Sequence, residues 1–136
     1  MKALSVRLPW SLFIATGEKT VECRSWKTSY RGPILICTSL YKEAGLKPEK
    51  ILGHAICIAT IDDCVPFTRQ HLKRSCMRWM PDGKNYALTL KDIQPIKPIP
   101  VKGKLGIFNV DLCPEFLNLY GDDLYEYLLN EEWILY

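Results

Sequence analysis

Two largely apolar runs set the strongest limit on how this chain can fold. The first covers residues 33–38 and reads Pro-Ile-Leu-Ile-Cys-Thr, and the second covers residues 53–61. Both runs are short and rich in β-branched residues, a pattern typical of strands that are buried on both faces. They predict two central strands of a sheet around which the other elements are placed.

Shorter segments complete a pattern of short strands with few helices. Further strands are expected at residues 3–7, 20–25, 86–90 and 106–111, and helices or helical turns at 10–15 and 68–79. Residues 41–52 could hold a short helix or a loop, and two acidic helices are expected at 115–120 and 123–130. The 136 residues suit one domain with a single core. Together these segments predict an α+β fold, a small, partly open mixed β-barrel of five to six strands with short helices at its ends.

Three prolines restrict the segment that follows the expected strand at 86–90. Pro95, Pro98 and Pro100 have no backbone N–H, so they exclude residues 94–101 from a central position in a hydrogen-bonded sheet. An edge position remains compatible with them. We therefore expect an edge strand or an extended connection here.

Charge is distributed unevenly along the chain, although the net charge is only +3. Residues 1–104 hold all 18 lysines and arginines with eight acids, whereas residues 105–136 hold seven acids and no base. A basic body is typical of a protein that contacts phosphates, so RNA, single-stranded nucleic acid or a nucleotide is the expected partner. The acidic terminal helices could instead pack against a basic neighbour or bind a protein partner.

Six cysteines and two histidines show no spacing that predicts a metal site. No Cys-x-x-Cys pair is present, and neither His54 nor His71 completes a zinc-ligand pattern. Cys37 and Cys57 lie inside the apolar runs, where a free thiol behaves as a small buried hydrophobic group. The sequence also shows no signal-like or membrane-length apolar segment. We therefore expect a cytoplasmic protein with reduced cysteines, no metal, no cofactor and no membrane contact.

The densest group of charged and aromatic residues lies between residues 17 and 32. Gly17 suits the left-handed position that closes a helix, so the helix at 10–15 should end there. In the strand that follows, Glu22 and Arg24 are two positions apart and therefore point to the same face. Lys19 stands at the turn between the two elements. This stretch is where a site is expected.

The pattern Gly17-x-Lys19-x-x-Glu22-x-Arg24 resembles the signature of the ASCH domain, a small β-barrel domain similar to the PUA domain that binds RNA. Flanking blocks agree in register with a single-domain bacterial and phage branch of that family: Arg7-x-Pro9-Trp10, Arg24-Ser25-Trp26, Tyr30-Arg31-Gly32, residues 53–65 and Pro100-Val101-x-Gly103-Lys104-x-Gly106. The resemblance covers residues 1–113.

The resemblance implies a PUA-like barrel with a cleft beside the motif and a role in handling nucleic acids or nucleotides. It implies a single ASCH domain over residues 1–136, in which 114–136 form an acidic helical extension. Members of the family look like RNA-binding modules, ribonucleases or amidohydrolases that act on acetylated cytidine. We predict binding of RNA or a modified nucleotide, and the alternative is a metal-independent hydrolase that uses Lys19.

The chain departs from the family pattern at positions that matter for hydrolysis. Residues 36–39 read Ile-Cys-Thr-Ser where an Ile-His-x-Ser block is expected, and Leu8 replaces the usual polar residue before the proline. The acetylcytidine hydrolases resemble a Lys-Thr-Glu set, but Glu22 stands where their threonine would be, and residues 66–80 contain no acid. These departures rank hydrolysis below binding.

Candidate site residues follow from charge, from aromatic character and from the resemblance. The nucleic-acid-binding candidates are Arg7, Trp10, Lys19, Arg24, Trp26, Lys27, Tyr30 and Arg31. If the protein is an enzyme, the catalytic candidates are Lys19, Glu22 and Tyr30. Basic side chains would contact phosphates, and exposed aromatic rings would stack on bases.

Structural roles compete with several of these assignments. Glu22 and Arg24 could hold the turn by charge-assisted hydrogen bonds rather than contact a ligand. Any single aromatic side chain could belong to the core. The basic segment 69–78 could contact phosphates or form a solvated face, and Asp62 with Asp63 could bind a metal or simply end a strand.

Overall fold

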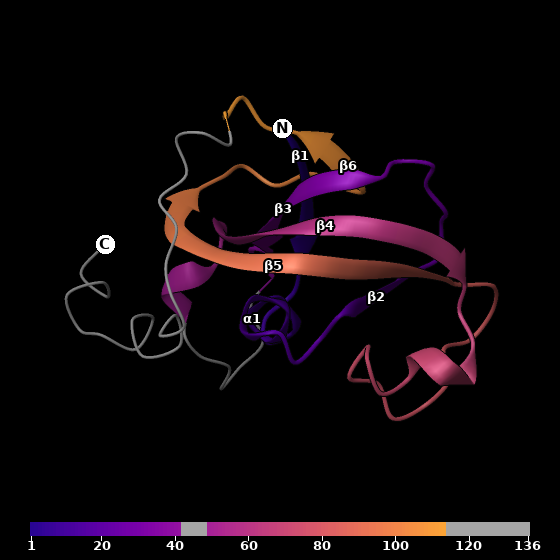
Figure 1. The fold of residues 1–136 in the computed structure, drawn as a ribbon. Coiled ribbons are helices and arrows are strands. Elements are labelled where there is room, and N and C mark those ends of the chain that lie inside the picture. Colours follow the sequence, from indigo (N-terminus) through magenta and orange to yellow (C-terminus); the bar gives the residue numbers. More distant parts are fainter. Residues whose placement is uncertain (42–48, 114–136) are drawn as a thin grey trace.

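The computed structural model describes residues 1–41 and 49–113 and consists of a curled six-stranded sheet around one α-helix (Figure 1). The strands are β1 (Lys2–Val6), β2 (Val21–Arg24), β3 (Gly32–Thr38), β4 (His54–Pro66), β5 (Tyr86–Pro100) and β6 (Ile107–Asn109). The helix is α1 (Trp10–Thr16), and two 3₁₀ turns are η1 (Glu49–Ile51) and η2 (Arg69–His71).

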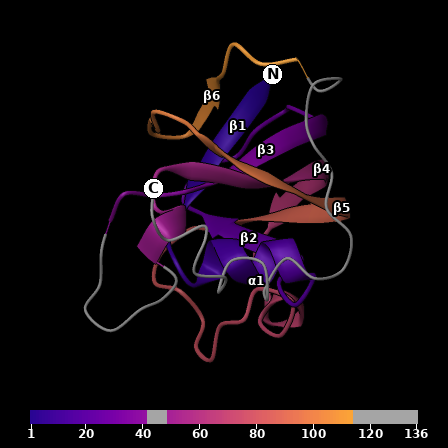
Figure 2. The same ribbon diagram turned by 90° about the vertical axis from the view of Figure 1, so that its left-hand side faces the viewer.

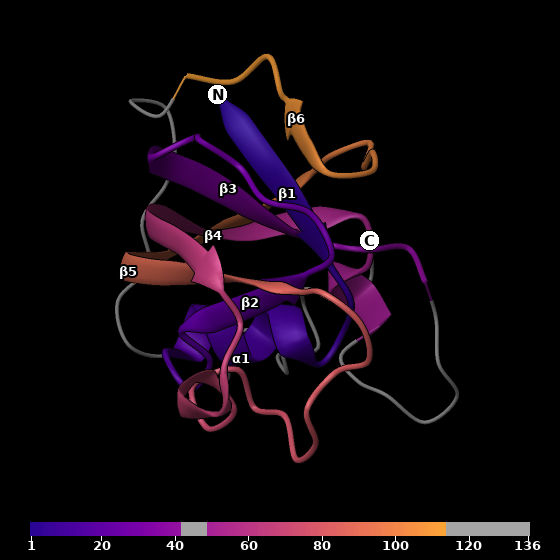
Figure 3. The same cartoon turned by 90° about the vertical axis from the view of Figure 1, so that its right-hand side faces the viewer.

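The sheet is mixed, as predicted for a partly open barrel. Its strand order is β2-β5-β4-β3-β1-β6. Strands β1 and β3 run parallel, and every other neighbouring pair runs antiparallel. Helix α1 packs against β1, β3, β4 and β5, and Figures 2 and 3 show it below the sheet, beside β2. The structure confirms the expected α+β half-barrel.

Both central strands follow the two apolar runs, and β3 is buried on both faces as its sequence predicts. Ile34 and Ile36 pack in the cluster that contains the α1 residues Leu12 and Ile14. The alternate residues of β3 point to a second cluster on the opposite face, which includes Leu35. Burial of each such side chain contributes about 1.5–3 kcal/mol. These two clusters fix the sheet on which the site is built.

Helix α1 ends where Gly17 was expected to close it. Gly17 adopts a φ of 87°, and its N–H donates to the carbonyl of Ile14. The chain then turns so sharply that the N–H of Lys19 donates to the carbonyl of Phe13 at 2.9 Å. This turn places Lys19 two residues before β2 and sets the position of the motif.

The basic segment at 68–79 contains much less helix than its pattern suggests. Helical geometry is confined to η2, and turns follow it. Two observations explain the difference. Cys76 adopts a positive φ of 60°, and the carbonyl of Arg74 accepts hydrogen bonds from the N–H groups of Thr20 and Val21 rather than from its own helix.

The proline-rich segment continues β5 rather than forming a separate strand. Residues 94–100 pair with β4, whereas β2 pairs only with residues 86–89. In the described ranges, the second half of β5 therefore lies at an edge of the sheet, where prolines are tolerated.

Two predicted regions fall partly or wholly outside the described residues. These are part of the segment at 41–52 and the acidic helices at 115–120 and 123–130. Among the residues that the structure describes, no helix combines the length and apolar character needed to cross a membrane.

Candidate ligand-binding pocket

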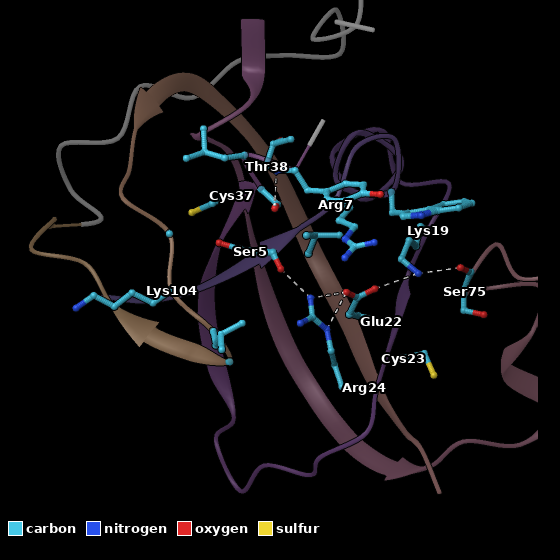
Figure 4. A pocket seen from close by; sticks show the side chains of 18 of the residues that line it. Ser5, Arg7, Lys19, Glu22, Cys23, Arg24, Cys37, Thr38, Ser75 and Lys104 are labelled. Carbon is cyan, nitrogen blue, oxygen red and sulfur yellow. Dashed lines mark hydrogen bonds and ion pairs between the residues drawn. The ribbon is translucent and has the colours of Figure 1, made fainter. Parts of the chain in front are cut away.

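An open pocket of about 880 Å³ lies where the parallel strands β1 and β3 end (Figure 4). Parallel strands present their carboxyl ends at the same edge of a sheet, so residues 5–7 and 37–39 meet there. The motif, the loop between β4 and β5 and the loop at 101–106 complete the lining. Segments far apart in the sequence thus build one site.

A buried ion pair between Lys19 and Glu22 lies in the lining of the pocket. The Nζ atom of Lys19 is 3.2 Å from Oε1 of Glu22 and donates a hydrogen bond of 2.8 Å to the carbonyl of Ser75. Lys19 is 3% exposed and Glu22 is 7% exposed. Buried charges are tolerated where they are paired in this way.

Arg24 shares the carboxylate of Glu22 with Lys19. Its Nε and one terminal nitrogen donate to Oε2 of Glu22 at 3.0 and 2.8 Å. The same terminal nitrogen donates to the carbonyl of Ser5 at 2.7 Å and so ties β2 to β1. Two cations therefore share one anion, and this trio carries a net positive charge at the pocket wall.

The hydroxyl of Ser5 is the polar atom in this site that lacks a partner. Its Oγ is buried and forms no hydrogen bond, as donor or as acceptor, with the described part of the chain. A Cβ atom at Gly103 would lie 2.8 Å from that oxygen, so any other residue at this position would displace the hydroxyl from where it stands. A ligand in the pocket could satisfy the hydroxyl, and leaving such a group unpaired costs about 1–3 kcal/mol.

Aromatic and basic side chains are exposed at the rim of the pocket. The guanidinium of Arg7 lies 3.9 Å from the centroid of the Tyr41 ring. Trp10 and Tyr41 are 41% and 50% exposed, which leaves ring surface open to solvent. Such rings can stack on a planar ligand beside a positive charge.

Two thiols line the pocket as neutral groups. Burial raises the pKa of Cys37 to about 12. Burial, with the nearby Glu22 carboxylate, raises the pKa of Cys23 above its ordinary value. A thiol with a raised pKa is a poor nucleophile and a poor metal ligand at neutral pH. Cys37 therefore replaces the expected histidine by a group without acid–base function.

The structure brings together five of the predicted site residues and separates the others from them. The pocket is lined by Arg7, Trp10, Lys19, Glu22 and Arg24, whereas Trp26, Lys27, Tyr30 and Arg31 are absent from its described lining. The catalytic candidates are therefore divided, because Lys19 contacts Glu22 but Tyr30 lies elsewhere.

The residues outside the pocket have other contacts. Trp26 packs against the main core, and its ring centroid is 5.9 Å from the Arg24 guanidinium. Tyr30 also packs on the core and donates its hydroxyl to the carbonyl of Pro33 at 2.5 Å. Arg31 pairs with Asp63 at 3.3 Å, and Lys27 is exposed. Trp26 and Tyr30 therefore support the sheet beneath the motif.

The paired acids at the far half of β4 bind basic side chains. Asp63 pairs with Arg31, and Asp62 lies 3.2 Å from Lys91. Within residues 1–41 and 49–113, no group of three or more histidine, cysteine or acidic side chains is placed to hold a metal ion.

Sequence reasoning missed several residues of the pocket. Tyr41 follows a buried strand without any motif of its own, and Ser5 is one polar residue in an apolar strand. Ser75 contributes only a backbone carbonyl, which no sequence pattern reveals. Gly103 had a signal, because it belongs to a block that resembles the family pattern.

Comparisons with known proteins identify the family. The ASCH domain family model matches residues 4–110, whereas a search of curated proteins finds no match. ASCH domains are PUA-like domains, a group generally linked to RNA binding.

Similar solved structures include three crystal structures of ASCH from Zymomonas mobilis. The unmutated protein is 18% identical with a TM-score of 0.53, over 94% of this chain and 92% of that chain. A serine-to-alanine mutant is 19% identical with a TM-score of 0.56, over 94% of this chain and 93% of that chain. A tyrosine-to-phenylalanine mutant is 20% identical with a TM-score of 0.55, over 94% of this chain and 95% of that chain. These structures confirm the PUA-like fold, and the family match establishes that this chain belongs to the ASCH domain family.

Proposed function

We propose that this protein binds RNA or a modified nucleotide in the pocket beside residues 17–24. The observation that carries the proposal is the trio of Lys19, Glu22 and Arg24, in which two cations share one carboxylate at the wall of an open pocket. An unbalanced positive charge in a partly dehydrated site attracts an anionic group such as a phosphate.

The rim supplies the contacts that a nucleobase requires. Trp10 and Tyr41 expose ring surface there, and base stacking on an aromatic side chain contributes about 1–3 kcal/mol. Arg7 lies over the Tyr41 ring and adds an exposed charge beside it. One nucleotide could therefore place its phosphate near the trio and its base against the aromatic rings at the rim.

The volume of the pocket and two uncharged polar groups in its lining fit the same ligand. Small-molecule sites commonly measure 300–1,000 Å³, a range that includes this pocket at about 880 Å³. The unpaired hydroxyl of Ser5 and the protonated thiol of Cys37 lie in the same lining. They can form hydrogen bonds with a base edge without adding charge.

The test is an anisotropy titration of labelled single-stranded RNA, with nucleosides and nucleotides as competitors. We expect Arg7→Ala to weaken binding at least fivefold and to reduce its dependence on salt. Arg31→Ala is the matched control, because it removes an exposed arginine outside the pocket lining. Equal losses in both variants, or no binding of any RNA, DNA or nucleotide by the unmutated protein, would exclude the proposal.

A metal-independent hydrolase remains the second candidate, on the contact between Lys19 and Glu22. At 3.2 Å the Lys19 Nζ and the Glu22 carboxylate are close enough to contact the same substrate group in the pocket, as a hydrolase that uses Lys19 requires. Incubation with RNA and with acetylated cytidine tests this activity. Turnover that survives unchanged in the Lys19→Ala variant would remove Lys19 from any mechanism.

A further inference from the structure

The loop between β4 and β5, residues 67–85, concentrates positive charge around an exposed tryptophan. The loop contains one acid, Asp82, and five lysines and arginines, all of which are exposed: Arg69, Lys73, Arg74, Arg78 and Lys84. Trp79 is 78% exposed, and Met80 beside it is also exposed. A large ring left in water among cations is characteristic of surfaces that bind unpaired bases and their phosphates.

This loop is continuous with the pocket. Ser75, Met77, Pro81 and Asn85 belong to the pocket lining. Trp79 stands two residues from both Met77 and Pro81, and consecutive Cα atoms are 3.8 Å apart. The Cα of Trp79 therefore lies within about 8 Å of the lining on either side.

Hydrogen bonds fix the loop to the motif. The carbonyl of Arg74 accepts from the N–H groups of Thr20 at 2.9 Å and Val21 at 3.1 Å. The Nε of Arg74 donates to the Thr20 hydroxyl at 3.0 Å, and the carbonyl of Ser75 accepts a hydrogen bond from the Nζ of Lys19. At the start of the loop, Phe67 is buried against Val21 and Ala87. A loop held in this way can bind a ligand with little further loss of conformational entropy.

We propose that residues 78–80, with the lysines and arginines of the same loop, form a second nucleotide subsite. It would hold the nucleotide next to the one bound in the pocket. The inference rests on the proposed function and narrows it: the ligand is a single-stranded oligonucleotide, whose chain runs from the pocket onto the loop. A duplex would not serve, because its base faces are stacked and unavailable to the Trp79 ring. Figures 1 and 3 show the loop projecting from the sheet below β2, the strand that carries Glu22 and Arg24.

The experiment compares ligands of increasing length. Binding of the four nucleoside monophosphates and of randomised single-stranded RNA of two, four and eight nucleotides is measured for the full chain. We expect the four-nucleotide RNA to bind at least tenfold tighter than any monophosphate. Trp79→Ala should weaken RNA binding about 5- to 150-fold, the range seen for loss of a stacking aromatic, and should leave monophosphate binding unchanged. Trp79→Phe, which keeps a stacking ring, should retain most of the affinity.

The charge of the subsite is tested with a matched pair of variants. Arg78→Ala should weaken RNA binding and reduce its salt dependence by about one phosphate contact, whereas Arg31→Ala should not. Affinity that does not depend on length, or equal losses for monophosphates and RNA in Trp79→Ala, would overturn the second subsite alone. If the unmutated protein binds neither RNA nor monophosphates, the proposed function fails as well.

Discussion

Glu22 is the residue on which the charge balance of the pocket depends. Its two carboxylate oxygens are divided between Lys19 and Arg24, so neither cation has another acidic partner among the described residues. Removing one member of a buried ion pair leaves an uncompensated charge. This destabilises a protein more than replacing the whole pair by apolar residues of similar size.

The first prediction concerns this carboxylate. Glu22→Gln should lower the free energy of unfolding by about 3 kcal/mol, because Lys19 and Arg24 would then lie together without a counter-ion. Glu18→Gln removes the same charge from an exposed position four residues earlier and should change stability by less than about 0.5 kcal/mol. Urea denaturation of the three proteins measures both values. A loss in Glu22→Gln no larger than that of the control would contradict a buried charge network.

The second prediction follows from the buried thiol of Cys37. Its pKa rises from 9.0 to about 12, so the folded protein binds this proton more tightly than the unfolded chain. The corresponding stability is fully present below pH 9 and is lost as the pH rises toward 12, by about 1.4 kcal/mol for each pH unit. Between pH 8 and pH 10, the native protein should therefore lose about 1.4 kcal/mol more than Cys37→Ala. Parallel pH profiles in urea denaturation would show that this thiol does not titrate differently on unfolding.

At the residue scale, the sequence identified the motif but not the environment of its members. Lys19 was expected at the turn between the helix and the strand, and the structure buries it there against a carbonyl 56 residues away. Such a partner is fixed by tertiary structure and leaves no local pattern. Trp26 and Tyr30 were expected at a ligand surface because they are aromatic and near bases, but the adjacent core competes for the same rings.

At the scale of elements, the turn at Gly17 connects the helix to the site. A φ of 87° is favourable for glycine, whereas other residues are strained there. No atom lies within 4 Å of a Cβ built at this position, so any cost of substitution comes from the backbone and not from a clash.

The third prediction uses that distinction. Gly17→Val should destabilise the protein by at least about 1 kcal/mol, because a β-branched residue strongly disfavours the left-handed conformation. Gly17→Asn should be clearly less harmful, since asparagine tolerates this conformation. Thermal unfolding of the two variants gives the comparison. Equal midpoints would mean that the backbone at residue 17 relaxes and that the turn does not depend on glycine.

Elements with a strong apolar pattern were predicted better than elements that depend on distant partners. The runs at 33–38 and 53–61 correspond to β3 and β4, because burial on both faces requires apolar residues throughout. The edge position of the prolines in β5 also followed from their missing N–H groups. The basic segment could not be assigned correctly, because the carbonyls of Arg74 and Ser75 bind the motif rather than a next helical turn.

At the scale of the whole molecule, charge separates along the chain. The family match ends at residue 110, and residues 114–136 hold six acids and no base. Negative charges within about a Debye length of a basic surface weaken its attraction for phosphates.

The fourth prediction tests this effect in the full chain. Replacing the six acids at 115, 122, 123, 126, 131 and 132 by their amides changes the net charge from +3 to +9. RNA affinity should rise at low salt, and log K should fall more steeply with log salt concentration. Circular dichroism before titration confirms that the variant is folded. Unchanged affinity and slope would show that this segment has no electrostatic influence on binding.

The position of β1 in the sheet has a consequence for how the protein is made. The first strand of the sequence lies between β3 and β6, so one of its two hydrogen-bonded edges stays open until residues 107–109 have been synthesised. Until then Ala3 and Leu35 lack Phe108, the aromatic side chain that completes their cluster. Such a non-local arrangement folds slowly and exposes an unpaired strand edge to other chains during translation. A lower expression temperature, which slows synthesis and association of nascent chains, should therefore favour recovery of the folded protein.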